Sequence, residues 1–170
     1  RGPEDEGIYQ KDNVALGHRR LSILDTSDSA HQPMISSDGR FIITYNGEIY
    51  NHLELRKGIE NKYTFHSTGD TETLLNAYIE YGNEVFSMLN GIFAIAIFDS
   101  VQNQITLARD HFGVKPLYYY LDSEKFLFGS EIKSINLFPI DRTLNFEAIY
   151  DYLRFLYAPF DNTPFKNVRK

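Results

Sequence analysis

The stretch Thr44-Tyr45-Asn46-Gly47-Glu48-Ile49-Tyr50-Asn51 follows a short apolar run at residues 41–43. The apolar run predicts a buried strand, and the polar residues after it predict a turn. Asn-Gly is the dipeptide most typical of a tight hairpin, so a purely structural turn is one interpretation. In the other, the Asn46 side-chain amide and the Gly47 N–H are adjacent donors that hold a negatively charged oxygen during acyl transfer. Glycine also lets the backbone approach a ligand closely.

The composition limits the kind of protein. The 170 residues are 42% hydrophobic and 15% aromatic, which is enough for one domain with a substantial core. A net charge of −6 argues against a nucleic-acid partner, because such partners bind basic surfaces. The longest apolar run, residues 92–98, predicts a buried strand and is much shorter than the roughly 20 residues of a membrane-spanning helix. We therefore expect neither nucleic acid nor membrane as a partner.

The remaining chain predicts strands beside helices. Polar, Gly- and Pro-rich composition predicts loops at residues 1–7 and 25–37. Apolar periodicity and flanking turn residues predict helices at 51–60, 70–81, 84–89 and 146–157, and strands at 14–18, 21–24, 92–98, 105–108, 117–121 and 126–129. This order favours an α+β fold with antiparallel strands.

Two charged residues are candidates for ligand binding. Arg20 is either a solvated surface residue or a strand-borne guanidinium that binds a carboxylate in bidentate fashion. Asp70 stands where a predicted helix begins, so it is a helix N-cap, a carboxylate for an amino-acid ammonium group, or both.

No metal site is expected from the histidines. They show no i, i+4 pair and no cysteine accompanies them, and no Gly-rich phosphate-binding loop occurs; the histidines are His18, His31, His52, His66 and His111.

A series of strings resembles, in the same order, class II glutamine amidotransferase domains of the glutamine-hydrolysing asparagine synthetase type. Tyr45, rather than histidine, precedes the Asn-Gly pair, which fits the synthetase branch. The strings are Arg1-Gly2-Pro3-Glu4-Asp5, His18-Arg19-Arg20-Leu21-Ser22-Ile23, Asn46-Gly47-Glu48-Ile49-Tyr50-Asn51, Gly69-Asp70-Thr71-Glu72 and Arg109-Asp110-His111-Phe112-Gly113-Val114-Lys115-Pro116-Leu117-Tyr118-Tyr119. We expect the last string to be a structural turn between two core strands.

The resemblance implies an amino-terminal-nucleophile (Ntn) hydrolase fold, a four-layer αββα sandwich of two antiparallel sheets. The family places a first strand and helix before the string at residue 1, so we expect truncation at the amino terminus. We expect a single glutaminase-like domain over residues 1–170, with a core to about 137 and, over 138–170, a terminal helix and a linker toward an absent synthetase domain. The missing strand would leave an unpaired sheet edge, so a homo-oligomer is expected.

The resemblance also implies residue roles. Asn46 and Gly47 would form the oxyanion hole. Arg20 would bind the α-carboxylate of glutamine, with the backbone of Ile23 and Leu24 along the same edge. Glu48 and Asp70 would complete the substrate site, with Asp70 facing the α-ammonium group.

In this family an amino-terminal cysteine attacks the glutamine side-chain amide and ammonia is released. The chain has no cysteine, so it is expected to be inactive by itself. The parent protein is expected to be a cytoplasmic asparagine synthetase that uses ATP and Mg²⁺, in its other domain, to amidate aspartate; no cofactor is expected in this domain. Two alternatives stay open: a glutamine-binding or interaction module without nucleophile, and the glutaminase domain of a sugar-modifying amidotransferase.

Overall fold

A computed structural model describes residue 2, residues 5–20 and residues 28–170. The chain divides into two compact units, Arg1–Val114 and Lys115–Lys170. The expectation of one domain over the whole chain stays a prediction.

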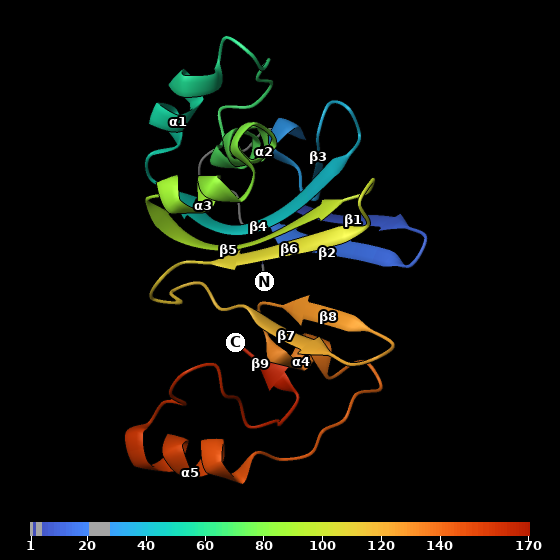
Figure 1. Cartoon of the computed structure of the whole chain (residues 1–170), viewed down its shortest axis with the longest axis vertical. Coiled ribbons are helices and arrows are strands. Elements are labelled where there is room, and N and C mark those ends of the chain that lie inside the picture. The colour runs from blue at the N-terminus through green and yellow to red at the C-terminus, as the bar shows by residue number, and fades with distance from the viewer. Residues whose placement is uncertain (1, 3–4, 21–27) are drawn as a thin grey trace. The chain divides into compact units, whose positions relative to one another are not determined.

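The first unit is built on a four-stranded antiparallel sheet of order β3-β4-β5-β6 (Figure 1). Its strands are β3 (Met34–Ile35), β4 (Phe41–Ile49), β5 (Gly91–Asp99) and β6 (Gln104–Arg109). The central strand β5 is buried from residue 93 to residue 99, as its unbroken apolar run predicts.

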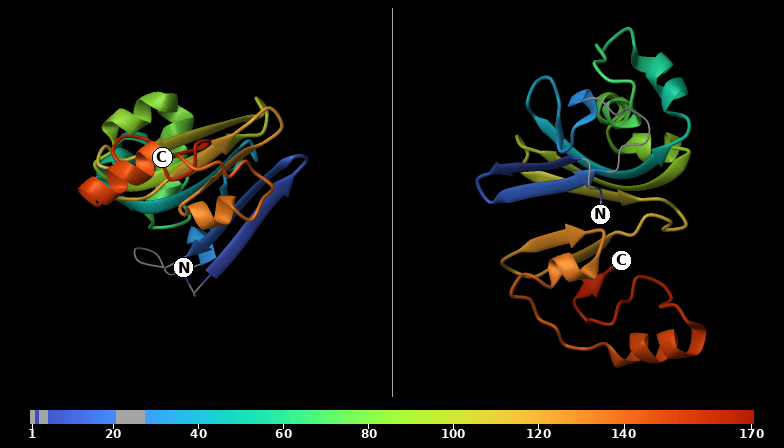
Figure 2. Two further views of the ribbon diagram at one scale, coloured as in Figure 1. Left: turned by 90° about the horizontal axis from the view of Figure 1, so that it is seen from below. Right: turned by 180° about the vertical axis from the view of Figure 1, so that it is seen from behind.

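Three helices cover one face of this sheet (Figures 1 and 2). They are α1 (His52–Ile59), α2 (Asp70–Tyr81) and α3 (Val85–Met88), the last preceded by a 3-10 turn, η2 (Gly82–Glu84). Leu74 and Leu75 of α2 pack in one core cluster with Ile43 and Ile95 of the sheet. Each such fully buried side chain stabilises the fold by about 1.5–3 kcal/mol. The predicted helices at 51–60 and 70–81 are confirmed.

A two-stranded hairpin contacts the opposite face of the sheet. It consists of β1 (Asp5–Lys11) and β2 (Val14–Arg20). The ring of Tyr9 approaches that of Phe98, with centroids 6.3 Å apart. Helices, sheet and hairpin thus form three successive layers of this unit, in agreement with the α+β class expected from the sequence.

The loop prediction for residues 1–7 is wrong at Asp5, Glu6 and Gly7, which belong to β1. The polar composition concealed the start of this strand, where the inward-facing Asp5 and Gly7 lie against residues 31 and 32. The loop prediction for residues 25–37 is wrong in part, since it contains a 3-10 turn, η1 (Asp28–Ala30), and β3. The strand predicted at 21–24 lies outside the described residues.

The second unit contains a three-stranded antiparallel sheet of order β8-β7-β9. Its elements are β7 (Tyr118–Leu121), β8 (Phe126–Gly129), α4 (Ile132–Ile135), α5 (Phe146–Phe155) and β9 (Val168–Arg169). Tyr120, Ile135 and Val168 form its buried core. Residues 138–170 therefore contain more than the expected helix and linker, because β9 pairs with β7.

The string 109–119 has the structural role that the sequence predicts. The buried Asp110 carboxylate accepts hydrogen bonds from the backbone N–H groups of Phe93, Phe112 and Val114, at 3.2, 3.1 and 2.9 Å. It thereby closes the turn after β6 against β5.

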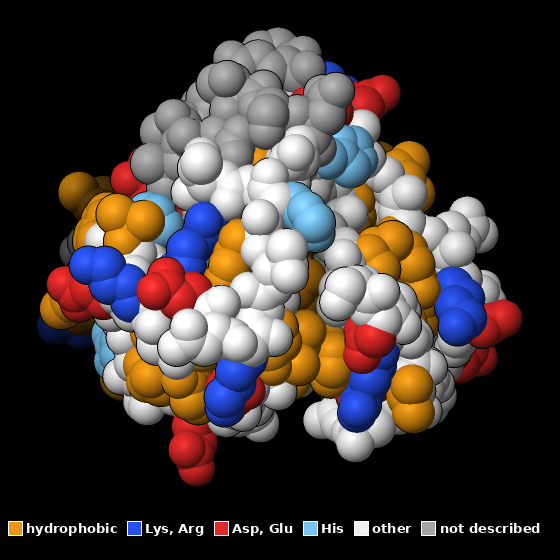
Figure 3. Space-filling view, turned by 90° about the horizontal axis from the view of Figure 1, so that it is seen from above, with side chains coloured by type: hydrophobic (Ala, Val, Ile, Leu, Met, Phe, Trp, Pro, Cys, Tyr) orange, Lys and Arg blue, Asp and Glu red, His pale blue; other side chains and the backbone are white. Residues whose placement is uncertain are grey.

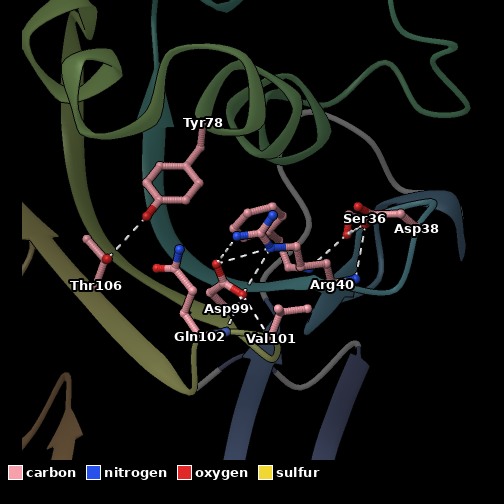
Figure 4. A network of polar contacts seen from close by, with 9 residues as sticks. Ser36, Asp38, Arg40, Tyr78, Asp99, Val101, Gln102 and Thr106 are labelled. Carbon is pink, nitrogen blue, oxygen red and sulfur yellow. Dashed lines mark hydrogen bonds and ion pairs between the residues drawn. The ribbon is translucent and has the colours of Figure 1, made fainter.

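A separate polar network fastens β4 to β5 at the opposite end of the sheet (Figure 4). Arg40 donates to both carboxylate oxygens of Asp99, with a shortest distance of 2.6 Å. Asp99 also accepts from the N–H groups of Val101 and Gln102. The Arg40 hydrogen bonds are the main reason that the pKa of Asp99 is lowered to about 2. These bonds hold the β5–β6 turn in place.

Candidate active site

Strand β4 continues without interruption through the Asn-Gly pair, so the predicted turn at this point is wrong. Asn46 pairs with Ala94 of β5, and Gly47 pairs with Phe93. The two strands approach so closely that a Cβ atom on Gly47 would lie 2.1 Å from the Ile92 carbonyl oxygen. Glycine is therefore required here by the neighbouring strand, and sheet pairing overrides the local preference of Asn-Gly for a turn.

The Gly47 N–H points away from β5. Phe93 directs its own backbone groups to Asp110: its carbonyl oxygen accepts from the Asp110 N–H at 2.9 Å, and its N–H donates to the Asp110 carboxylate. Because opposite residues of an antiparallel pair either exchange both hydrogen bonds or neither, Gly47 and Phe93 form a non-hydrogen-bonded pair. The N–H of Gly47 therefore lies on the outer edge of β4, beyond the two residues that pair with β3.

Side chains occupy that outer edge on both sides of Gly47. The Tyr45 N–H donates to Gln32 Oε1 at 2.7 Å, and the Ile49 N–H donates to Asp70 Oδ2 at 2.9 Å. Within the described part of the chain, no group accepts from the Gly47 N–H that lies between them. The edge thus offers one backbone donor between two covered positions.

Asp70 is turned toward the sheet and does not cap its helix. The N-cap residue of α2 is Gly69, so the capping role predicted for Asp70 is wrong. Its side chain is 6% exposed, and Oδ2 accepts from the Tyr45 hydroxyl at 2.8 Å as well as from Ile49. Burial and the adjacent Asp70 carboxylate raise the pKa of Tyr45 above its normal range, so the phenol stays protonated.

Asn46 and Glu48 direct their side chains to the other face of β4. Side chains alternate along a strand, and Tyr45 and Ile49 are buried on the helix-covered face. Asn46 and Glu48 are therefore on the face that the β1–β2 hairpin contacts, and both are partly exposed. The Asn46 amide makes no hydrogen bond to any described residue, so it is available beside the Gly47 N–H.

Arg20 is the last residue of β2 and is only 9% exposed, so it is not a solvated surface residue. It shares the inner face of β2 with Leu16 and His18, whereas the residues between them are exposed. Burial, followed by the positive charge of Arg20, lowers the pKa of His18 to about 4. His18 is therefore neutral at pH 7 and leaves Arg20 as the cation of this face.

Residues 31 and 32 lie between the hairpin and the edge of β4. A Cβ atom on Gly7 would lie 2.2 Å from the Gln32 carbonyl oxygen, and His31 Nδ1 lies 2.7 Å from Asp5 Oδ2. Gln32 also donates from Nε2 to Thr71 Oγ1 at 3.3 Å. This segment links the hairpin that carries Arg20 to the edge that carries Gly47 and the helix that carries Asp70. The predicted contacts from Ile23 and Leu24 lie outside the described residues.

Arg56 of α1 holds the turn that precedes Asp70. Its guanidinium donates to the carbonyl oxygens of Ser67 and Gly69, at 2.9 and 2.8 Å, and to the Thr73 hydroxyl at 2.7 Å. The planar group lies over the Phe65 ring, 4.3 Å from its centroid. Five donors in a fixed fork suit this task, because several acceptors must be reached at once.

Glu72 fixes the same turn from the helix side. Its buried carboxylate accepts from the N–H groups of His66 and Ser67 and from the Ser67 hydroxyl, at distances between 2.7 and 3.0 Å. Sequence reasoning identified neither Arg56 nor Glu72. Glu72 stands in the string Gly69-Asp70-Thr71-Glu72, but nothing in the string assigns it a role. For Arg56 the only signal is a charged residue within an amphipathic helix, which is too common to single it out.

The described parts hold no cluster of metal ligands, and one face of the molecule shows no basic patch. Residues 2, 5–20 and 28–170 contain no group of three histidine, aspartate or glutamate residues that could hold a metal ion. On the face shown in Figure 3, basic side chains are interspersed with acidic and apolar ones. No described helix is long and apolar enough to cross a bilayer.

Comparison with known proteins identifies the family to which the chain belongs. The family model of the glutamine amidotransferase domain matches residues 1–170. Asparagine synthetase [glutamine-hydrolyzing] 1 of Bacillus subtilis is 40% identical over 100% of this chain and 27% of its own length. Asparagine synthetase B [glutamine-hydrolyzing] of Escherichia coli is 41% identical over 85% of this chain and 26% of its own length. The chain thus spans about a quarter of the length of these relatives.

A solved structure of glutamine phosphoribosylpyrophosphate amidotransferase from B. subtilis resembles the chain with a TM-score of 0.59. The match covers 72% of this chain and 28% of the other, at 24% sequence identity, and concerns the fold. It supports the Ntn-hydrolase type expected from the sequence. The chain belongs to the glutamine amidotransferase domain family.

Proposed function

We propose that the chain binds glutamine at the outer edge of β4 and the start of α2. The observation that carries this proposal is the Gly47 N–H, which no described residue accepts from, between two covered positions and next to the buried Asp70 carboxylate, whose Oδ1 accepts from no described residue. An α-amino acid with a side-chain amide matches this set of groups. Its ammonium group would face Asp70, its carboxylate would face Arg20, and its amide oxygen would meet Asn46 and Gly47.

In the parent protein, this domain would hydrolyse glutamine and supply ammonia to a synthetase domain. The names of the two relatives from Bacillus subtilis and Escherichia coli, both glutamine-hydrolysing asparagine synthetases, support aspartate as the acceptor. The nucleophile would be an amino-terminal cysteine, as in the family resembled, and Asn46 with Gly47 would stabilise the oxyanion. ATP and Mg²⁺ would act in the synthetase domain. A cytoplasmic location and homo-oligomeric assembly belong to the same proposal.

The absence of cysteine from the 170 residues favours a second candidate for the chain by itself. Without a nucleophile it would bind glutamine and release no ammonia, as a sensing or interaction module does. The amino-terminal sequence of the parent chain would distinguish the two candidates, because only the enzyme has the cysteine that forms glutamate and ammonia.

The test is isothermal titration of the purified chain with L-glutamine, together with an assay for ammonia. We expect saturable binding to the wild type, loss of binding in Asp70→Asn, and no ammonia above the buffer control. Gly58→Ala is the matched control, because a Cβ at this α1 position would meet only the Tyr81 hydroxyl, at an ordinary 3.6 Å. Absence of binding by a folded wild type would overturn the proposal, and ammonia release would overturn the assigned mechanism.

A further inference from the structure

The two oxygens of the Asp70 carboxylate have different environments. Oδ2 accepts two hydrogen bonds, from the Tyr45 hydroxyl at 2.8 Å and from the Ile49 N–H at 2.9 Å. Oδ1 accepts none from the described residues. Since a carboxylate is planar, fixing one oxygen at two points also fixes the direction in which the other oxygen points.

Tyr45 is well suited to fix that oxygen. Its side chain is 4% exposed and packs in the same core cluster as Leu74 and Leu75 of α2. Its backbone is held as well, because Gln32 accepts from its N–H at 2.7 Å. The aromatic ring has only two rotatable bonds, so packing and backbone together leave the hydroxyl one position. As its phenol stays protonated, the hydroxyl is always the donor in this pair.

We propose that Tyr45 is a positioning residue for ligand binding: its hydroxyl holds Asp70 Oδ2 so that Oδ1 faces the α-ammonium group of the bound amino acid. This inference rests on the proposed function, in which Asp70 receives that ammonium group. It adds a specificity-determining role for the residue directly before the Asn-Gly pair. Tyr45 itself does not touch the ligand.

The test compares two ligands that differ by one group. L-Glutamine carries the α-ammonium group, and 4-carbamoylbutanoate is glutamine without it. Because the chain has no cysteine, binding can be titrated calorimetrically without turnover. The variants are Tyr45→Phe, which removes only the hydroxyl, and Asp70→Asn.

Tyr78→Phe is the matched control. Tyr78 packs against the same core cluster, and its hydroxyl lies 3.2 Å from Thr106 Oγ1 (Figure 4). It makes no hydrogen bond to Asp70, whose partners are Tyr45 and Ile49. Tyr78→Phe therefore measures how the loss of a hydroxyl from this core changes the Kd when no hydrogen bond to Asp70 is lost. Thermal melting of each variant confirms that the comparison is made between folded proteins.

We expect Tyr45→Phe to raise the Kd for L-glutamine roughly tenfold, the effect of a hydrogen bond to a charged group. The Kd for 4-carbamoylbutanoate should change less than about twofold, and Tyr78→Phe should alter neither constant. Equal weakening of both ligands by Tyr45→Phe, or no weakening, would overturn the inference. If Asp70→Asn still discriminates between the ligands as the wild type does, the proposed role of Asp70 fails and the inference fails with it.

Discussion

Gly47 of β4 lies opposite Phe93 of β5, and this pair exchanges no backbone hydrogen bond because Phe93 bonds instead to Asp110. The strands are so close at this point that Gly47 has no space for a side chain.

Gly47→Ala should therefore destabilise the protein, whether or not a ligand is present. Its Cβ would meet the backbone of Ile92 and Phe93, at 2.1 and 2.8 Å, and one strand must move. We expect a loss of about 1–3 kcal/mol or more in the free energy of unfolding, measured by urea denaturation. Gly58→Ala is the control and should be neutral or stabilising by up to about 1 kcal/mol, because alanine is the better helix former. Equal stability of the two variants would contradict the close approach.

Asn46→Ala, in a protein that includes the nucleophilic cysteine, should reduce kcat with little change in KM. The side-chain amide would bind the oxygen when negative charge develops, and removing one such donor typically costs on the order of 10²–10³ in rate. Asn46→Asp should be at least as damaging, because a carboxylate would face the developing charge. Single-turnover rates of glutamine hydrolysis measure both effects, and near-wild-type rates for Asn46→Asp would exclude Asn46 from the oxyanion hole.

Arg20→Ala, in the same cysteine-containing protein, should mainly raise KM for glutamine. A guanidinium–carboxylate contact is made in the ground state and in the transition state alike, so its loss weakens binding and leaves kcat nearly constant. Steady-state kinetics provide the measurement. An unchanged KM in a folded variant would remove Arg20 from the site.

Asp99 should make stability depend on pH in the acidic range. Its pKa is lowered to about 2 in the folded protein, from an ordinary value near 3.8. At pH values above 3.8 the carboxylate is ionised and contributes its full stabilisation to the fold. That contribution disappears as the pH falls through about 2. We expect Asp99→Asn to be less stable than the wild type by about 1 kcal/mol at pH 7 and the difference to shrink between pH 4 and pH 2. Urea unfolding at several pH values measures this.

The outer edge of β6 should support self-association. No described strand pairs with it, and exposed strand edges favour pairing between chains. Sedimentation velocity should show species larger than a monomer as the concentration rises. Leu107→Pro should weaken this association because it removes an N–H group from the outer edge of β6. Hydrogen-bonded and non-hydrogen-bonded pairs alternate along two antiparallel strands, and Phe93 exchanges hydrogen bonds with Asp110. The pair of Leu107 with Ala96 is therefore non-hydrogen-bonded, and the Leu107 N–H points outward. A clean monomer of the wild type at high concentration would contradict the prediction.

The sequence predicted elements where one local signal dominates. The bounds of α2 follow from apolar spacing and from Gly82, which ends the helix with φ of 58°. By contrast, the Asn46-Gly47 dipeptide favours a turn because its preference is local, whereas the pairing that overrides it comes from residues far along the chain. The same limit explains why Gln32 and Tyr45 were missed as supports of the site. Their contacts join residues 13 and 25 positions apart, which no periodic pattern reveals.

The covered edge of β4 also bears on how the protein avoids unwanted partners. An added β-strand needs a free N–H and C=O at every second residue over several residues. Along β4, β3 pairs with residues 42 and 43, and side chains bind the N–H groups of Tyr45 and Ile49. Among the described residues this leaves the N–H of Gly47 as one open position, which is too few to start a ladder. In the proposed function, that position would bind one oxygen of a single amino acid, and the covered edge would exclude a polypeptide strand.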